Sequence, residues 1–289
     1  MKKIMVATDF SERSDRALER AALLAREFGA SLVFIHVVDD DQPRRIVDIE
    51  RDEAETLLKQ TAAMHHEVDG VICETRVILA SSFAGIIQAV EDEKPDLLVI
   101  GQHRRSVLKD VFIGTTAERT IRLVDCPVLM VNAPPAGPYQ HVMQTTDLSG
   151  SSGDALARFR SLGLSGVAWN TLLYVFFAPA LRLAFRHSMQ KDEQDLYLAE
   201  EKKAALCKLG EFLAAAKLGN ITPMVRFEAT AAHHEILNAA DEENADLIVL
   251  STHGRTGLAK LLIGSVTERV LRSSSVDILA IPPARSPQP

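Results

Sequence analysis

Two stretches of the sequence combine glycines with hydroxyl residues in a way that suits phosphate binding. They are "GQHRRSVLKDVFIGT" at 101–115 and "STHGRTGLAKLLIGS" at 251–265. Each ends on a glycine followed by Ser or Thr at the expected start of a helix: Gly114-Thr115 and Gly264-Ser265. The unpaired N–H groups and the positive dipole end of a helix attract anions, and a glycine lets a phosphate approach the backbone. Because the same pair of residues also forms ordinary helix caps, the pattern alone does not decide between the two roles.

Both stretches belong to an internal repeat that covers most of the chain. "TDFSERSDRAL" at 8–18 returns as "TDLSGSSGDAL" at 146–156, a shift of 138 positions. "GTTAERTIR" at 114–122 returns as "GSVTERVLR" at 264–272, a shift of 150, so the second copy is 12 residues longer in its middle. Between the copies lies "NAPPAGPYQ", whose prolines and glycine disfavour regular structure and indicate a linker.

Within each copy, short apolar runs alternate with amphipathic stretches of helical period. The first of these helices is expected to begin after Ser11 as N-cap and to end at Gly29. Strands that are apolar nearly throughout and separated by helices are typical of a parallel sheet covered on both faces. A chain of 289 residues is long enough for two such units. We therefore predict two similar open α/β domains, Rossmann-like with five parallel strands each, at residues 1–138 and 139–289.

The repeated motifs are expected at the carboxyl ends of the strands, where open parallel sheets bind ligands. Asp9 and Asp147 follow the first strand of their copies, while Gly101 and Ser251 follow the fourth. This placement favours a phosphate at the last helix and a sugar or base toward the first two strands. A simpler role for both aspartates is to cap the helix that follows.

Composition argues against several kinds of partner. The formal net charge is −7 and no long basic run is present, so we expect neither nucleic acid nor an anionic membrane as a partner. Three unclustered cysteines and a start without an apolar signal segment favour the reducing cytoplasm. The pairs His65-His66 and His233-His234 would point apart on a helix, and no Cys or carboxylate completes a ligand set, so we expect no metal site.

Taken together, the motifs resemble the universal stress protein family. The carriers of the resemblance are TDxSxxSxxAL, a strand ending in "HVV", and the GxxGx9G[ST] spacing followed by xxERxxR, and they imply a tandem of two domains over nearly the whole chain. For each half, the resemblance implies a five-stranded parallel sheet between helices, of the adenine nucleotide alpha-hydrolase-like type. It further implies a cytoplasmic stress-response protein that acts as a sensor or signalling module. The implied ligand is ATP or another adenine nucleotide such as AMP, with or without Mg2+.

The resemblance also carries a nucleotide site onto the second half, with these positions: Asp147 and Val175 near the nucleoside, and Gly254, Gly264 and Ser265 at the phosphates. Ser251 stands where the family has its first Gly, and its hydroxyl can donate a hydrogen bond. The equivalent set in the first half is Asp9, Val37, Gly101, Gly114 and Thr115. There Arg104 replaces the middle Gly, and an arginine lacks the backbone freedom of glycine. We therefore expect nucleotide binding mainly in the second half, and weak binding or none in the first.

Two other functions remain open. "SGSSGD" at 149–154 resembles the SGGxDS phosphate loop of ATP pyrophosphatases, an adenylating class, but Ser151 replaces one of its glycines and no HxGH motif is present. A ligand-free interaction scaffold is the other alternative. The sequence contains no recognisable nucleophile with a positioned base and no pair of catalytic carboxylates, so we expect no catalytic residues and at most slow ATP hydrolysis.

The last strands of the two copies, "CPVLMV" and "DILAI", have apolar edges that would promote aggregation if exposed. Family members commonly pair through these strands, so the resemblance implies a pseudo-twofold pair of domains within this chain, with a homodimer of the whole chain as an option. We also expect surface ion pairs on the last helix of each half, from the residues Glu118, Arg119, Glu268 and Arg269.

Overall fold

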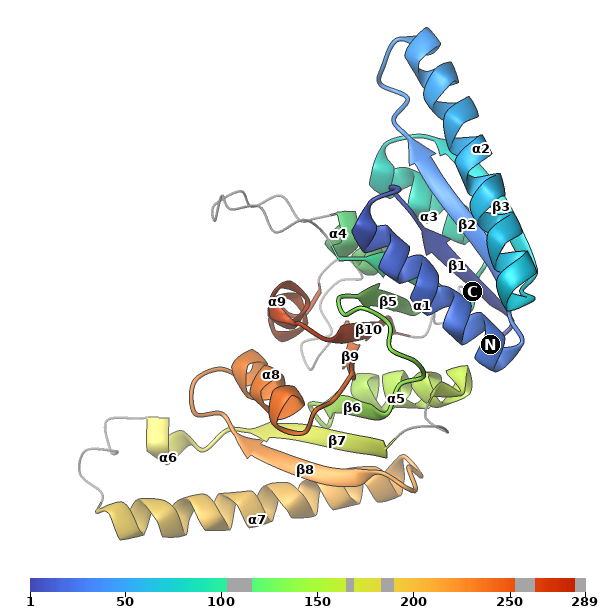
Figure 1. The fold of residues 1–289 in the computed structure, drawn as a ribbon. Helices are drawn as coiled ribbons and strands as arrows, with labels where there is room; N and C mark the ends of the chain where they lie inside the picture. The colour runs from blue at the N-terminus through green and yellow to red at the C-terminus, as the bar shows by residue number, and fades with distance from the viewer. Residues whose placement is uncertain (103–115, 165–168, 183–189, 253–262, 284–289) are drawn as a thin grey trace, which may run out of the picture.

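A single ten-stranded sheet runs through the computed structural model, which describes residues 1–102, 116–164, 169–182, 190–252 and 263–283 (Figure 1). The first half contains, in chain order, β1 (Lys3–Ala7), α1 (Glu12–Phe28), β2 (Ser31–Val38), α2 (Arg44–Asp69), β3 (Cys73–Leu79), α3 (Ser82–Glu93), β4 (Leu97–Gly101), α4 (Thr116–Leu123) and β5 (Val128–Val131). The second half contains β6 (His141–Thr146), α5 (Gly150–Leu162), β7 (Trp169–Phe176), α6 (Pro179–Arg182), α7 (Lys191–Ala215), β8 (Thr222–Phe227), α8 (Ala232–Glu242), β9 (Leu247–Ser251), α9 (Ser265–Ser273) and β10 (Asp277–Ile281).

The strand order is β3-β2-β1-β4-β5-β10-β9-β6-β7-β8. Strands are parallel within each half, and β5 meets β10 in antiparallel register, with Met130 opposite Ile278 and Val128 opposite Ala280. The last strands of the two halves are equivalent and pair in opposite directions, which is the arrangement that a twofold axis produces. The predicted α/β fold and the predicted pairing through the last strands are both confirmed.

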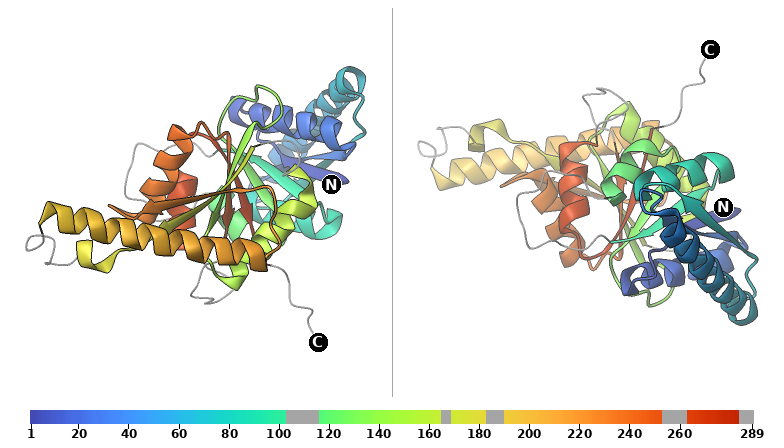
Figure 2. Two further views of the ribbon diagram at one scale, coloured as in Figure 1. Left: turned by 90° about the horizontal axis from the view of Figure 1, so that it is seen from below. Right: turned by 90° about the horizontal axis from the view of Figure 1, so that it is seen from above.

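Helices cover both faces of the sheet (Figure 2). The layer of α1, α2 and α5 packs on one face, while α3, α4, α8 and α9 pack on the other. In β1, Ile4 and Val6 face the first layer and Met5 faces the second, and all three side chains are fully buried. Burial on both faces explains why the strands are apolar at nearly every position rather than at alternate ones.

The helix ends follow the predicted signals. Ser11 caps α1 by accepting a hydrogen bond from the Ser14 N–H, and Gly29 ends the helix with φ 62°. The extra residues of the second copy lie in its second crossover, because β7 and β8 are joined through α6 and α7 whereas β2 and β3 are joined through α2 alone. Within the described residues, no helix combines the length and the apolar character needed to cross a membrane.

A buried carboxylate ties the two halves to the segment that joins them. Asp277, at the start of β10, is fully buried, and its Oδ1 accepts hydrogen bonds from the N–H groups of Asn132 and Ala133 at 2.9 and 3.1 Å. Its Oδ2 accepts a 2.7 Å hydrogen bond from the Tyr139 hydroxyl and lies 3.3 Å from Nε of Arg20 in α1. Arg20 also donates to the Gly137 carbonyl and stacks on the Tyr139 ring. Both halves and the linker therefore meet at one charge.

The pseudo-twofold symmetry breaks at this network. Arg158 is the counterpart of Arg20 in the repeat, but the position equivalent to Asp277 is occupied by Pro127. Arg158 donates instead to the backbone carbonyls of Asp125 and Pro282, so it also crosses between the halves. The two equivalent arginines therefore bind different groups: Arg20 pairs with a carboxylate, whereas Arg158 binds backbone carbonyls.

The last helices also meet across the pseudo-twofold axis, which corrects the expected surface pairs. Glu118 is buried, and its two carboxylate oxygens accept hydrogen bonds from Arg272 of the other half at 2.7 and 3.2 Å. Glu268 pairs with the same Arg272 at 2.7 Å, on its own helix. Arg119 lies instead over the Phe83 ring. The sequence pattern could not separate an exposed face from one covered by the other half.

The buried network gives a prediction for stability. Asp277→Ala should lower the free energy of unfolding by about 3–5 kcal/mol, because it leaves Arg20 buried without its counter-charge. The measurement is urea denaturation of the full chain, with Asp241→Ala, an exposed carboxylate, as the matched control expected to stay within about 0.5 kcal/mol. Equal losses from the two variants would contradict a joining role for Asp277.

Candidate functional site

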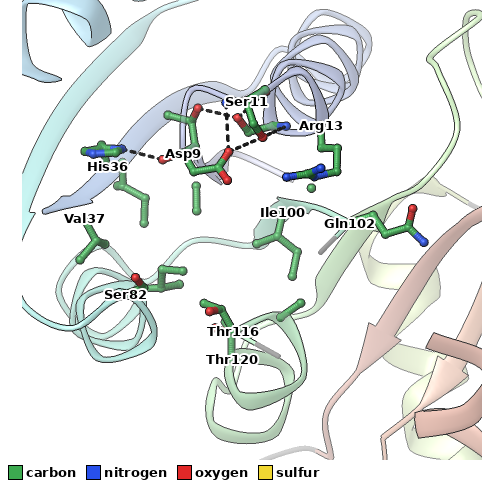
Figure 3. Close-up of a pocket in the computed structure, with 17 residues that line it drawn as sticks. Asp9, Ser11, Arg13, His36, Val37, Ser82, Ile100, Gln102, Thr116 and Thr120 are labelled. Carbon is green, nitrogen blue, oxygen red and sulfur yellow. Dashed lines mark hydrogen bonds between the residues drawn. The ribbon is translucent and has the colours of Figure 1, made fainter. Parts of the chain in front are cut away.

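A cavity of about 230 Å³ opens at the carboxyl ends of β1, β2 and β4 in the first half (Figure 3). Its apolar lining comes from the strand ends and from α3 and α4, and includes Ala7, Ile35, Val37, Ile86, Ile100 and Ala117. Its polar lining includes Asp9, Ser11, Arg13, His36, Ser82, Gln102, Thr116 and Thr120. Parallel strands end at the same edge, so residues far apart in the sequence meet here, as is typical of ligand sites in open α/β sheets.

The turn from β1 into α1 forms one wall of the cavity. Asp9 Oδ1 accepts hydrogen bonds from the N–H and the hydroxyl of Ser11 at 3.1 and 2.5 Å. Burial alone would raise the pKa of Asp9, but these bonds, together with the charge of Arg13, hold that pKa below its usual value. Asp9 is therefore a carboxylate that stays charged at the mouth of the cavity.

The same turn contains a second repeated hydrogen-bond pair. Thr8 Oγ1 accepts from the Phe10 N–H at 3.0 Å and donates to Ser14 Oγ at 3.0 Å. These bonds hold the backbone of Phe10 in the left-handed region at φ 58°, a conformation that residues other than Gly rarely adopt. The TDxSxx part of the motif thus builds the strand-to-helix turn.

The second half repeats this turn in detail. Asp147 Oδ1 accepts from the N–H and hydroxyl of Ser149 at 3.0 and 2.5 Å, and Thr146 pairs with Ser152 at 2.9 Å. Leu148 takes the same left-handed conformation, with φ 64°. Both aspartates therefore position the serine that caps the next helix, and the caps themselves are Ser11 and Ser149 rather than Asp9 and Asp147.

Close packing against α1 explains why position 101 is a glycine. A Cβ at this position would lie 2.7 Å from the carbonyl oxygen of Arg13 and 2.9 Å from its carbon, both in the first turn of α1. The second half has Ser251 at the equivalent position, so its first helix cannot sit against the strand in the same way.

A second glycine brings α3 close to the cavity floor. A Cβ on Gly85 would lie 2.6 Å from Cγ1 of Val37, so α3 could not approach β2 this closely with any other residue. By the repeat, Glu235 is the equivalent of Gly85, and Val175 is the equivalent of Val37. Glu235 lines a different hollow, of about 410 Å³, together with residues of α7 and β8. The two halves therefore differ in the residue that faces this part of the sheet.

The remaining predicted residues divide into two groups. Gly114, Thr115 and Gly254 lie outside the described residues. Gly264 is the N-cap of α9, directly before Ser265, and its N–H donates to the Thr252 carbonyl at 3.0 Å. Thr267 also donates to the Ser251 carbonyl at 2.9 Å, so the end of β9 and the start of α9 are held together. Among the described residues, the atoms nearest to a Cβ at Gly264 would be the Thr252 carbonyl oxygen and Oγ1 of Thr267, both 3.9 Å away.

Several lining residues were not singled out from the sequence. Ser11 belongs to the repeated motif and could have been found there, but Arg13, Ser82 and Gln102 carry no signal beyond their position after a strand or at a helix start. Among the described residues, no group of three or more His, Cys, Asp or Glu side chains could hold a metal ion.

The two glycines at strand and helix ends give a paired prediction. Gly101→Ala should lower the free energy of unfolding by about 1–3 kcal/mol, because the new methyl group overlaps backbone atoms of α1. Gly264→Ala is the matched control and should cost at most about 1 kcal/mol, because the new methyl group meets no atom of the described residues closer than 3.9 Å. Urea denaturation of both variants measures the difference, and a larger loss for Gly264→Ala would refute the packing role of Gly101.

Comparisons with known proteins agree with this architecture. The sequence profile of the universal stress protein family matches residues 1–132 and 138–282. A universal stress protein of Methanocaldococcus jannaschii is 32% identical over 142 residues, which cover 46% of this chain and 83% of that protein. One from Mycolicibacterium smegmatis is 21% identical over 301 residues, which cover 97% of each chain.

Solved structures show the same tandem fold. The crystal structure of a universal stress protein from Archaeoglobus fulgidus superposes with a TM-score of 0.69 at 18% identity, covering 97% of this chain and 98% of that one. At this identity the likeness concerns the fold alone. Because the family profile matches each half in turn and the halves share one architecture, the chain belongs to the universal stress protein family, as a tandem of two such domains.

Proposed function

We propose that this protein is a stress-response module that binds an adenine nucleotide, ATP or AMP, at the carboxyl ends of its strands. The observation that carries the proposal is the first-half cavity, in which an apolar floor is bordered by a charged carboxylate and several hydroxyl groups. Ligand pockets typically pair an apolar lining with a few polar groups that fix orientation. A purine base suits the floor beside Val37, and ribose hydroxyls suit the acceptor oxygens of Asp9.

The phosphate end is supported by the start of α9 in the second half. Among the described residues, no atom lies closer than 3.9 Å to a Cβ at Gly264, and the first N–H groups of α9 point out of the start of the helix there. The hydroxyl of Ser265 adds a donor at the same place. A chain of phosphates would extend from there toward Asp147, with Mg2+ as the counter-ion that ATP itself brings.

The two halves are proposed to differ in how much of the nucleotide they hold. The first half keeps the nucleoside end, and its cavity of about 230 Å³ lies below the roughly 300–1,000 Å³ common for ligand pockets. Arg104 interrupts its glycine pattern at the phosphate end. The second half keeps the glycines at positions 254 and 264, so ATP should bind there more tightly, while the first half favours AMP or a nucleoside.

A ligand-free scaffold is the alternative function, and co-purification separates the two. Protein purified without added nucleotide, then denatured and filtered, should release material that absorbs at 260 nm and elutes as an adenine nucleotide. Binding by isothermal titration with ATP tests the same point directly. A chain that releases no nucleotide and gives no binding heat with ATP or AMP would leave the scaffold as the better description.

Single residues test the proposed nucleotide site. Gly264→Val should weaken ATP binding at least about tenfold, because a branched side chain enters the space before α9. Asp147→Ala should weaken binding by about 1.5–3 kcal/mol, because it removes a charged hydrogen-bond acceptor. The measurement is ATP affinity by titration, with thermal unfolding recorded for each variant.

The matched controls lie in the first half. Gly114→Val and Asp9→Ala should change ATP affinity little if the second half binds the nucleotide more tightly. A larger loss from the first-half variants would reverse the order of the two sites, and unchanged affinity in a folded Gly264→Val would exclude the phosphate site at α9.

A further inference from the structure

Helix α2 lies at the outer end of the molecule (Figure 1). It carries a line of exposed apolar side chains. A separate set of residues on α2 is buried and packs the helix on β2 and β3: Val47, Ala54, Leu58, Ala62 and His65. The exposed set, which we call the α2 stripe, consists of Ile46 (42% exposed), Ile49 (57%), Leu57 (39%), Met64 (53%) and Val68 (78%). Five large apolar side chains on one helix in water favour a covering partner.

The stripe is a continuous line rather than scattered residues. At about 100° per residue, four of its members fall within roughly 40° around the helix axis, and Ile49 lies about 60° to one side. This direction is roughly a quarter turn from the buried face. Asp69, which pairs with Arg26 of α1, lies on the other side of the helix, so the α2 stripe is turned away from α1.

We propose that the α2 stripe docks against the same stripe of a second copy of this chain, with the two α2 helices antiparallel. The order of its residues is self-complementary. If the second helix runs in the opposite direction and the twofold axis passes at residue 57, Ile46 of one copy faces Val68 of the other, and Leu57 faces Leu57. Ile49 and Met64 face each other when the axis passes within one residue of that position. One residue is about 1.5 Å along a helix, so a single twofold axis satisfies every pair.

The charges that border the stripe agree with the antiparallel arrangement. Arg45 and Glu67 are both exposed, on the same side of the stripe, and the described residues supply neither with an ion-pair partner. Reversal about residue 56 brings Arg45 opposite Glu67 of the second copy, and the twofold repeats the pair. A parallel arrangement would place Arg45 beside Arg45 and Glu67 beside Glu67.

The counterpart helix in the second half does not offer the same surface. The large apolar side chains exposed on α7, in the part of the chain that the structure describes, are Leu196 and Leu206. They lie ten positions apart, which places them about 80° apart around the axis. A second copy is therefore expected to dock through α2. One helix pair forms a small interface, so the dimer should be weak and dependent on concentration.

Charge reversal at the border tests the proposal in the full-length protein. Sedimentation velocity should show a monomer–dimer equilibrium that Arg45→Glu or Glu67→Arg alone weakens at least about tenfold. The double variant should restore it, because the opposite charges face each other again. Each reversal places a charge that the helix dipole favours, Glu at the start and Arg at the end, so loss of the dimer would not come from loss of the helix.

Leu57→Asp tests the apolar centre, and Glu200→Arg on α7 is the matched surface control. Leu57→Asp should abolish the dimer with the fold intact by circular dichroism, whereas Glu200→Arg should leave it unchanged. The proposal is overturned by a wild-type chain that stays monomeric up to about 1 mM, the weakest affinity worth testing. It is equally overturned by a dimer that survives Leu57→Asp, or by single reversals that the double variant fails to rescue.

Discussion

The buried charge of Asp277 is the constraint on which the two-domain arrangement depends. Removing a carboxylate from water costs several kcal/mol unless its oxygens are fully bonded. Here one oxygen receives two N–H groups from the linker, and the other receives a hydroxyl and lies beside a guanidinium. These partners come from the first helix and the linker, and Asp277 belongs to the last strand, so the groups meet only when β5 and β10 pair in one register. Apolar edges alone would tolerate a slip, whereas Asp277 does not.

The repeat has diverged mainly at positions that set spacing. The turn after the first strand is the same in both halves, down to the left-handed Phe10 and Leu148. By contrast, Gly101 and Gly85, which let helices approach β4 and β2 closely in the first half, are replaced by Ser251 and Glu235 in the second. The shared turn keeps the same polar groups at the strand ends of both halves, while the residues that allow close helix packing differ. This is the physical basis for expecting different ligands in the two halves.

The sequence predicted the parts of the fold that depend on local pattern. Apolar runs, helix caps at Ser11 and Gly29, and the two copies of one motif were enough for the strands and the helices, while the pairing of the last strands was implied by the family resemblance. It could not predict that Glu118 is buried against Arg272, because an exposed helix face and one covered by another domain have the same pattern. Nor could it predict why Gly101 is a glycine, since the atoms it avoids belong to Arg13, far away in the chain.

The outer edges of the sheet limit how copies of the chain can associate. β3 and β8 end the strand order, and an unprotected edge would invite further strands. β3 carries the exposed charges Glu74 and Arg76, and β8 contains Pro223, which has no N–H to donate to a neighbouring strand. Sheet extension is therefore disfavoured at both ends, which leaves helix packing as the route for association. Since the self-complementary stripe lies on α2 and α7 lacks its counterpart, association through it closes at two copies rather than growing into a filament.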